Sequence, residues 1–268
     1  MTAQQKLKQK VDNGLHVCVG LDTDAKKIPR YLHTHKNPIL EFNRIIIENT
    51  FKQASAYKIN FAFYEKDGER GFENIANTLE MIPEDILTIA DAKRGDISNT
   101  AKMYAQSIFD HFNSDAVTLN PYMGFDSLSP FLEYPDKLNF ILSLTSNSGS
   151  SDFEKQKLTE GKFLYQKVIE KVNEWNIKNN CGLVFGATNL YELSENISSF
   201  NQMPILLPGI GTQGGDLKEI VTVFHKSNNK NFLVNVSRAL IYADSSENFG
   251  NAVSQTIKDY NSIIASLT

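Results

Sequence analysis

One short segment of the chain concentrates the residue types that can perform acid–base chemistry. It reads Asp91-Ala-Lys93-Arg-Gly-Asp96 and lies at the end of the apolar run that begins at Leu87. Two aspartates and a lysine are costly to bury in such a run unless they neutralise one another. Lys58, near the end of another apolar run, completes a set of two lysines and two aspartates. Such an array can hold an ionised lysine as a proton donor and aim fixed charge at a reacting carbon.

The spacing of these residues indicates that they share one side of a sheet. Side chains two residues apart in a strand point the same way, so Asp91 and Lys93 are expected to project together. The same rule forms three further groups: Lys58 and Asn60; Cys18, Gly20 and Asp22; and Val234, Val236 and Arg238. Charges that end several strands converge at one mouth of a barrel, where barrel enzymes carry their active sites. The alternative for any one of these charges is a solvated side chain or a structural ion pair.

These groups lie on a repeated alternation of short apolar runs and longer amphipathic segments. Eight runs are predicted to be strands: residues 16–22, 54–61, 87–93, 116–120, 139–145, 182–188, 204–210 and 232–238. Eight strand–helix units within about 250 residues favour a (β/α)8 TIM barrel, and a doubly wound open sheet is the structural alternative. Residues 1–268 show no break in composition that would mark a linker, which favours a single domain.

Helical periodicity fills the segments between several of the strands. Ser98 is predicted to cap one helix, and Asp216 to cap another with Glu219 in a capping-box-like pair. Apolar spacing predicts two more helices, one across residues 164–175 and a final one across residues 253–267.

The segment Pro208-Gly-Ile-Gly-Thr-Gln-Gly-Gly-Asp216 follows the seventh predicted strand and runs into a helix. Gly209, Gly211 and Gly214 satisfy the G-x-G-x-x-G pattern of dinucleotide sites. That pattern normally opens a fold and is followed by an acidic strand end, and neither condition holds here. The segment better fits a monophosphate site, in which backbone N–H groups and a helix N-terminus hold the phosphate and Arg238 closes on it.

Composition excludes several other classes of protein. The chain has 268 residues with 27 basic and 31 acidic side chains, and its net charge of −4 argues against nucleic-acid binding. No apolar run approaches a membrane span, and the polar first 14 residues argue against a secretory signal. Cys18 and Cys181 lie in apolar runs on non-neighbouring strands, so a reduced cytoplasmic protein is expected.

A metal site is not expected. His33 and His35 have the spacing of a ligand pair, but they fall in the loop beyond the first predicted strand. The other histidines, His16, His111 and His225, do not end strands, so a barrel metal hydrolase would lack ligands.

Seven motifs together resemble the orotidine 5′-phosphate decarboxylase family, in its longer bacterial-type branch, and the resemblance covers essentially the whole chain. The motifs are Gly20-Leu-Asp22, Lys58-Ile-Asn60, Asp91-Ala-Lys-Arg-Gly-Asp-Ile97, Asn120-Pro-Tyr-Met-Gly124, Thr145-Ser-Asn147, Pro208-Gly-Ile-Gly-Thr-Gln-Gly-Gly215 and Ser237-Arg238. The resemblance implies decarboxylation of orotidine 5′-monophosphate to UMP and carbon dioxide, the last step of de novo UMP synthesis.

The resemblance also implies roles for the charged residues. Lys93 would deliver a proton to C6 of the pyrimidine after carbon dioxide leaves. Asp91 would lie against the substrate carboxylate, and Lys58 would bridge Asp91 and the ribose hydroxyls. Asp96 would reach into the site of the neighbouring subunit of a homodimer, with Thr100 nearby.

The remaining implied contacts hold the substrate without metal or organic cofactor. They are Asp22 and Asn60 at the ribose, Ser146 at the pyrimidine, Gln213 and Arg238 at the phosphate, and Gly211 and Gly214 in the phosphate loop. Two alternatives stay open. One is a metal-dependent phosphosugar barrel enzyme of the keto-pentulose-phosphate decarboxylase or hexulose-phosphate synthase type, and the other is a non-catalytic nucleotide-phosphate sensor.

Overall fold

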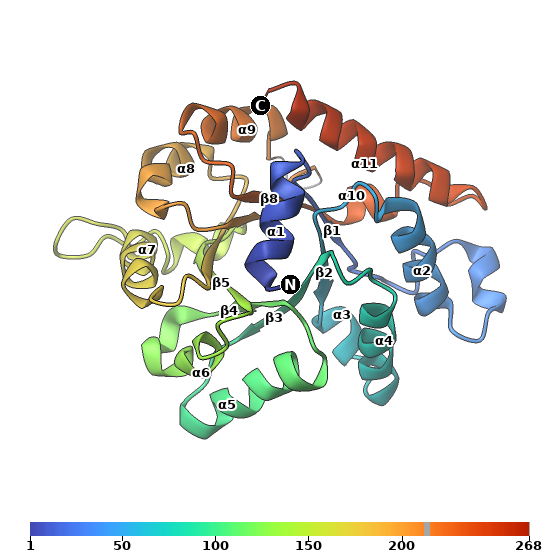
Figure 1. Cartoon of the computed structure of the whole chain (residues 1–268), viewed down its shortest axis with the longest axis horizontal. Helices are drawn as coiled ribbons and strands as arrows, with labels where there is room; N and C mark the ends of the chain where they lie inside the picture. The colour runs from blue at the N-terminus through green and yellow to red at the C-terminus, as the bar shows by residue number, and fades with distance from the viewer. Residues whose placement is uncertain (212–214, 268) are drawn as a thin grey trace.

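The strands form a closed ring in sequence order, as a computed structural model of the chain shows for residues 1–211 and 215–267 (Figure 1). The strands are β1 (Val17–Gly20), β2 (Ala56–Asn60), β3 (Leu87–Arg94), β4 (Ala116–Leu119), β5 (Leu138–Leu144), β6 (Cys181–Phe185), β7 (Ile205–Leu207) and β8 (Phe232–Val236). Every neighbouring pair is parallel, and β8 closes on β1 with Val17 opposite Val234. All eight predicted strands are confirmed, and closure rules out the open-sheet alternative in favour of a (β/α)8 TIM barrel.

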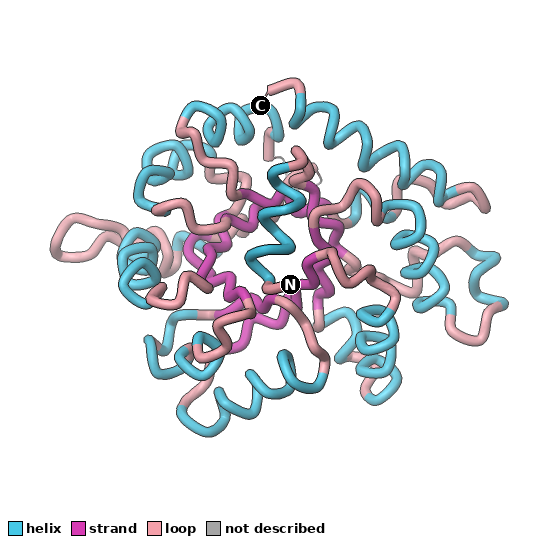
Figure 2. The backbone as a smooth tube through the Cα atoms, viewed as in Figure 1, coloured by secondary structure: helices cyan, strands magenta, loops and turns pink. Residues whose placement is uncertain are grey.

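Helices surround this ring (Figure 2). They are α1 (Ala3–Asp12), α2 (Pro38–Thr50), α3 (Ala62–Glu65), α4 (Glu69–Glu80), α5 (Ser98–Gln106), α6 (Ser129–Leu132), α7 (Leu164–Trp175), α8 (Leu190–Asn196), α9 (Leu217–Lys226), α10 (Arg238–Ile241) and α11 (Phe249–Ala265). Among the described residues, no helix has both the length and the apolar character needed to cross a membrane.

Two predicted helices and the predicted cap at Asp216 are confirmed, whereas the predicted cap at Ser98 is wrong. Asp216 caps α9, since its carboxylate accepts hydrogen bonds from the backbone N–H groups of Lys218 (2.8 Å) and Glu219 (3.1 Å). The predicted helices at 164–175 and 253–267 are α7 and α11. Ser98, by contrast, is the first residue of α5 and gives no side-chain cap, because Ile97 occupies the cap position.

The alternation of side chains along each strand divides the core into two layers. On β1, Val17 and Val19 pack outward against the helices, whereas Cys18 joins an apolar cluster inside the barrel. That inner cluster includes Phe140, which crosses toward β6. Gly182 makes this possible, because a Cβ at that position would lie 2.9 Å from the Phe140 ring. Below the C-terminal mouth, the barrel is therefore a packed core.

Helix α1 covers the N-terminal end of the ring (Figure 2). Its buried side chains Ala3, Leu7 and Val11 join the inner cluster. Lys6 pairs with Asp115 at 2.8 Å and Lys10 with Asp85 at 2.5 Å, and both aspartates precede strands at that end of the barrel. The N-terminal end is thus closed, which leaves the C-terminal ends of the strands to build a site.

We expect Leu7→Ala to lower the free energy of unfolding by about 2–5 kcal/mol, since Leu7 is only 3% exposed and its removal leaves a cavity at the barrel end. Urea unfolding measures this change. Lys8→Ala on the exposed side of the same helix is the control, expected within about 0.5 kcal/mol of wild type. Equal effects of the two substitutions would contradict the sealing role of α1.

Candidate active site

A pocket opens at the C-terminal ends of the strands, and its walls differ in character. One part is charged and is built from β1, β2 and β3, which bring Asp22, Lys58, Asn60, Asp91 and Lys93 together. Across the ring, β5, β6 and β7 contribute apolar side chains, namely Leu142, Val184 and Leu206. The pocket therefore combines a charged wall with an apolar wall.

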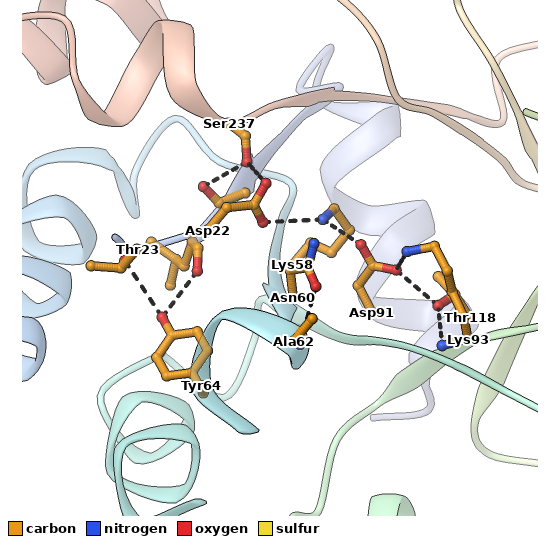
Figure 3. Close-up of polar contacts among 12 residues, drawn as sticks. Asp22, Thr23, Lys58, Asn60, Ala62, Tyr64, Asp91, Lys93, Thr118 and Ser237 are labelled. Carbon is orange, nitrogen blue, oxygen red and sulfur yellow. Dashed lines mark hydrogen bonds and ion pairs between the residues drawn. The ribbon is translucent and has the colours of Figure 1, made fainter. Parts of the chain in front are cut away.

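The charged wall is a continuous chain of ion pairs (Figure 3). Lys58 Nζ lies 2.8 Å from Asp91 Oδ2 and 3.5 Å from Asp22 Oδ1. Asp91 Oδ1 in turn accepts a hydrogen bond of 2.6 Å from Lys93 Nζ. Lys58 and Asp91 are buried, with 3% and 8% of their surface exposed, whereas the Lys93 side chain is half exposed at the mouth. Fixed positive charge is thus held at the edge of the pocket by a buried carboxylate.

The protonation states follow from these contacts. Burial by itself would raise the pKa of Asp91, but the ammonium groups of Lys58 and Lys93 outweigh it and hold that pKa well below its usual range. Burial would lower the pKa of Lys58, but Asp22 and Asp91 raise it above its usual range. Beneath this pair, burial raises the pKa of the Cys18 thiol to about 12. Lys58 and Asp91 are therefore ionised at neutral pH, above a neutral thiol.

A bulge at the end of β3 sets the direction of Lys93. Ala90 pairs with Val117 and Arg94 with Leu119, so residues 91–93 lie opposite the single residue Thr118. Lys93 takes a left-handed backbone with φ of 48°, a conformation that costs a non-glycine residue about 1–3 kcal/mol. Bulges of this kind redirect side chains beside active sites. The alternation rule put Asp91 and Lys93 on the correct side without revealing this distortion.

Asp22 is held from the last strand of the barrel. The Ser237 hydroxyl lies 2.5 Å from Asp22 Oδ2, and the two residues are 215 positions apart in the chain (Figure 3). Closure of β8 on β1 brings them together. The second acid at Lys58 within one chain is thus Asp22, whereas the sequence grouped Asp96 with the two lysines. Asp96 lies beyond the end of β3, and its Oδ1 accepts a hydrogen bond from the backbone N–H of Ile97 (2.8 Å).

The long segment after β5 contributes to the pocket through Glu154. Its carboxylate accepts hydrogen bonds from the backbone N–H of Thr145 (2.7 Å) and from the Thr145 hydroxyl (2.9 and 3.0 Å). On the other side, Asn189 Nδ2 donates to the Thr145 carbonyl at 2.9 Å. Thr145, Ser146 and Asn147 all line the pocket. The segment therefore fixes the strand end that carries the predicted pyrimidine contact, Ser146.

Arg238 lines the pocket, but not for the reason that the alternation rule gave. Val234 and Val236, with which that rule grouped it, pack outward against the helices. Arg238 reaches the pocket because β8 ends at Val236 and Arg238 opens the short helix α10.

The glycine segment after β7 lies at the same end of the pocket. Pro208, Gly209 and Ile210 line the cavity, and Gly209 and Gly211 take positive φ values of 102° and 83°. The expected use of the α9 N-terminus needs correction, because the Asp216 carboxylate already accepts from its first free N–H groups. Gly211 is near the pocket rim without lining it, and the predicted residues Gln213 and Gly214 lie outside the described residues.

The remaining predicted residues do not line the pocket of this chain. Asp96 follows β3, Thr100 lies in α5, and neither lines the cavity. His33 belongs to a short 3-10 turn (Arg30–Thr34) and His35 follows it, outside the pocket. In the described part of the chain, no three His, Cys, Asp or Glu side chains gather where they could hold a metal ion. Cys18 and Cys181 are both free and buried.

Sequence reasoning gave no role to five polar residues that line the pocket, namely Thr118, Thr145, Asn147, Asn235 and Ser237. The signal for the first was present, because Thr118 is two residues from Asn120 on a strand whose other members are apolar. Asn235 and Ser237 alternate with the outward valines of β8 and so face inward. No local sequence pattern could have identified Glu154, because only the fold brings it to its partner Thr145.

Fold and site together define a (β/α)8-barrel enzyme whose C-terminal mouth carries a nearly neutral array of lysines and aspartates. Residues 15–252 match the family model described as Orotidine 5'-phosphate decarboxylase / HUMPS family. The chain belongs to this family.

Named relatives agree with that assignment. The chain is 45% identical over 264 residues to an orotidine 5'-phosphate decarboxylase of Dehalococcoides mccartyi (strain CBDB1), which covers 97% of this chain and 96% of the relative. A relative of the same name from Christiangramia forsetii is 44% identical over 252 residues, with 93% of this chain and 92% of the relative covered. The solved structure of Leishmania donovani OMP decarboxylase superposes with a TM-score of 0.85 at 35% identity, over 99% of this chain and all (100%) of that one.

Loss of the Asp91 charge tests the electrostatics of the array. Because the pKa of Asp91 is depressed in the fold, the unfolded state alone binds this proton as the pH falls through about 3.9. Unfolding free energy should therefore decrease below about pH 5, with Asp91 contributing up to about 1.4 kcal/mol per pH unit. Asp91→Asn should remove that contribution and cost about 3–5 kcal/mol at pH 7, where it leaves Lys58 partly unpaired.

Urea unfolding between pH 7 and pH 3 measures both effects. Asp12→Asn is the control, since Asp12 is an exposed partner of Lys8 on α1 and its loss is expected to change stability by less than about 1 kcal/mol. A wild-type pH slope in Asp91→Asn would contradict the assigned ionisation.

Proposed function

We propose that this protein decarboxylates orotidine 5′-monophosphate to UMP and carbon dioxide in pyrimidine biosynthesis. The observation that carries the proposal is the buried Lys58–Asp91 pair, which presents the ammonium of Lys93 at the pocket edge with a contact of 2.6 Å to Asp91. Membership of the decarboxylase family and the names of the relatives support the substrate.

The chemistry explains why fixed charge is needed. When the bond between C6 and the carboxylate breaks, its electron pair stays on C6 as a carbanion that the pyrimidine π-system does not absorb. Stabilisation must then be electrostatic, and a fixed ammonium interacts more strongly with that carbanion than with the starting carboxylate. Lys93 gives a proton to C6 and becomes neutral, which completes UMP. Asp91, whose low pKa keeps it ionised, repels the substrate carboxylate and holds Lys93.

The apolar wall contributes to the same effect. Val184 and Leu206 are almost entirely buried and face the pocket from across the barrel. A ring placed between this wall and the charged wall loses water on one side, which strengthens the interaction of C6 with the ammonium. In this proposal Asp22, Asn60 and Lys58 hold the ribose, and Ser146 holds the pyrimidine.

The opposite end of the pocket has the groups that a phosphate requires. Arg238 lines it together with the backbone of Gly209 and Ile210, and we assign Gln213 to the same phosphate. Phosphate binding far from C6 contributes to catalysis because it places the ring and helps to exclude water from the mouth.

The two alternative functions, a phosphosugar enzyme and a nucleotide sensor, require different features of the site. A phosphosugar barrel enzyme that works through an enediolate normally uses a divalent metal ion, so chelation would stop it. A nucleotide sensor would gain nothing from a repulsive aspartate beside a carboxylate. The intact set of Lys58, Asp91 and Lys93 favours decarboxylation over both.

Ultraviolet absorbance of orotidine 5′-monophosphate mixed with purified protein in EDTA tests the function. We expect loss of the substrate band with UMP as product, and a decrease in kcat of at least about 10²- to 10⁴-fold in Lys93→Ala, which lacks the proton donor. Lys258→Ala, on the exposed face of α11, is the matched control and should match wild type.

Each other outcome identifies an alternative. Nucleotide that is bound but unchanged by wild-type protein would favour the sensor. Protein that neither binds nor converts it would exclude the proposed substrate, and activity that disappears in EDTA would favour the metal-dependent enzymes.

We also propose a homodimer in which Asp96 and Thr100 serve the partner's pocket. Both residues lie beside the mouth without lining their own cavity. Their surroundings are unusually apolar for a surface, with Ile97 and Met103 57% and 53% exposed and Tyr122 76% exposed. Close approach of the two segments supports a continuous patch, since a Cβ at Gly95 would lie 2.6 Å from the Asn120 carbonyl oxygen. Such a patch is typical of an interface.

Subunit mixing tests this arrangement. Lys93→Ala and Asp96→Ala proteins, each of low activity, should recover about a quarter of wild-type activity after exchange, because half of the dimers would then hold one intact site. Lys93→Ala mixed with Lys58→Ala is the control and should recover none, since both residues belong to the same chain's pocket. No recovery with Asp96→Ala would contradict the shared site.

A further inference from the structure

Thr118 lies at the centre of the charged wall, although its side chain is uncharged. It belongs to β4, is 1% exposed, and lines the pocket beside Asp91 and Lys93. Its hydroxyl accepts a hydrogen bond of 3.0 Å from the backbone N–H of Lys93 and donates one of 3.0 Å to Asp91 Oδ1 (Figure 3). The Thr118 side chain therefore contacts both Asp91 and Lys93.

The hydrogen bond from the Lys93 N–H to the Thr118 hydroxyl compensates for the irregular strand pairing at the bulge. Residues 91–93 have only Thr118 opposite them, so the N–H of Lys93 has no place in the regular ladder between β3 and β4. The Thr118 hydroxyl supplies the missing acceptor. It thereby stabilises the left-handed backbone at Lys93, where φ is 48°.

The second contact is determined by the first. An N–H group can only donate, so the hydroxyl uses its own hydrogen for Asp91. It donates to Oδ1, which also accepts from Lys93 Nζ at 2.6 Å, whereas Oδ2 accepts from Lys58 at 2.8 Å. The rotation of the carboxylate is then fixed, and with it the place of the ammonium.

The opposite end of the same two strands has an equivalent arrangement that is remote from the pocket. The Thr88 hydroxyl on β3 accepts from the backbone N–H of Asp115 (3.0 Å) and donates to Asp115 Oδ2 (3.1 Å). Lys6 from α1 pairs with that aspartate at 2.8 Å. Thr88 lines none of the described pocket at the C-terminal mouth. The chain thus offers a matched structural control for Thr118.

We propose that Thr118 is a positioning residue that sets the spacing between Asp91 and Lys93 for proton delivery to C6. The inference rests on the proposed decarboxylation. Because the hydroxyl already donates its single hydrogen to Asp91 and accepts from the Lys93 N–H, Thr118 acts on turnover and leaves nucleotide affinity to other residues.

The test compares Thr118→Val, which replaces the hydroxyl with a methyl group of similar size, with Thr118→Ser, which keeps it. Thr118→Val should lower kcat for orotidine 5′-monophosphate on the order of 10- to 100-fold, because it removes two hydrogen bonds from the pair. Its KM and its UMP dissociation constant should stay within about threefold of wild type, and Thr118→Ser should recover most of the lost kcat.

Exchange of the C6 proton of UMP in D₂O adds a second readout, since this is the reverse of protonation and uses the same geometry. Thr118→Val should slow this exchange by a similar factor to kcat. Thr88→Val should lower the melting temperature and leave both rates unchanged. All rates are expressed per UMP-binding site, so that unfolded protein is not counted, and Thr118→Ala deletes the same hydroxyl if the valine variant does not fold.

Three outcomes would overturn the inference while the proposed function stands. They are a normal kcat in both Thr118→Val and Thr118→Ala, an equal loss in Thr118→Ser and Thr118→Val, and a loss expressed in KM alone. An inactive wild-type protein would instead overturn the proposed function, and the inference with it.

Discussion

Burial of the Lys58 ammonium is the constraint on which the rest of the site depends. With 3% of its surface exposed, this cation has lost most of its water, and the carboxylates of Asp22 and Asp91 offset that loss. Each carboxylate is held in turn, Asp22 by Ser237 and Asp91 by Thr118 and Lys93. The ammonium of Lys93 is the last member of this series of ion pairs, and its side chain is half exposed. The position of the Lys93 ammonium at the pocket edge is thus set by the buried ion pairs behind it.

The closed barrel is what makes such a chain of contacts possible. Its members come from β1, β2, β3, β4 and the end of β8, which adjoin one another only because β8 pairs with β1. The other strands supply apolar side chains to the opposite wall. An open sheet with the same strands would separate Asp22 from Ser237 and leave one carboxylate without its support. Closure therefore has a chemical as well as an architectural role.

Much of this could be predicted from the sequence because it depends on local periodicity. The two-residue repeat grouped Asp91 with Lys93 and Lys58 with Asn60, and the structure places all four in one pocket. The repeat failed where the backbone leaves the regular strand. It carries no sign of the bulge at residues 91–93, and it grouped Arg238 with the outward-facing Val234.

Contacts between distant segments were also beyond prediction. Glu154 reaches Thr145 from a long connection whose path is set by packing, and Ser237 meets Asp22 across 215 residues. Asp96 illustrates a third limit. In the proposed homodimer its role depends on a second subunit, and no pattern within one chain describes the surface of another.

Helix α1 limits the routes by which small molecules can leave the barrel. Leu7 and Val11 close one end of the barrel, and the layer above them is filled by side chains such as Phe140. In the proposed reaction, carbon dioxide released beside Lys93 meets these packed residues along the barrel axis, so it leaves past the bound nucleotide, through the mouth by which the substrate entered. Carbon dioxide and UMP then share one exit, so whichever product occupies the mouth determines when the other departs. The N-terminus lies at the opposite end, so a fusion partner attached to Met1 would leave that opening unobstructed.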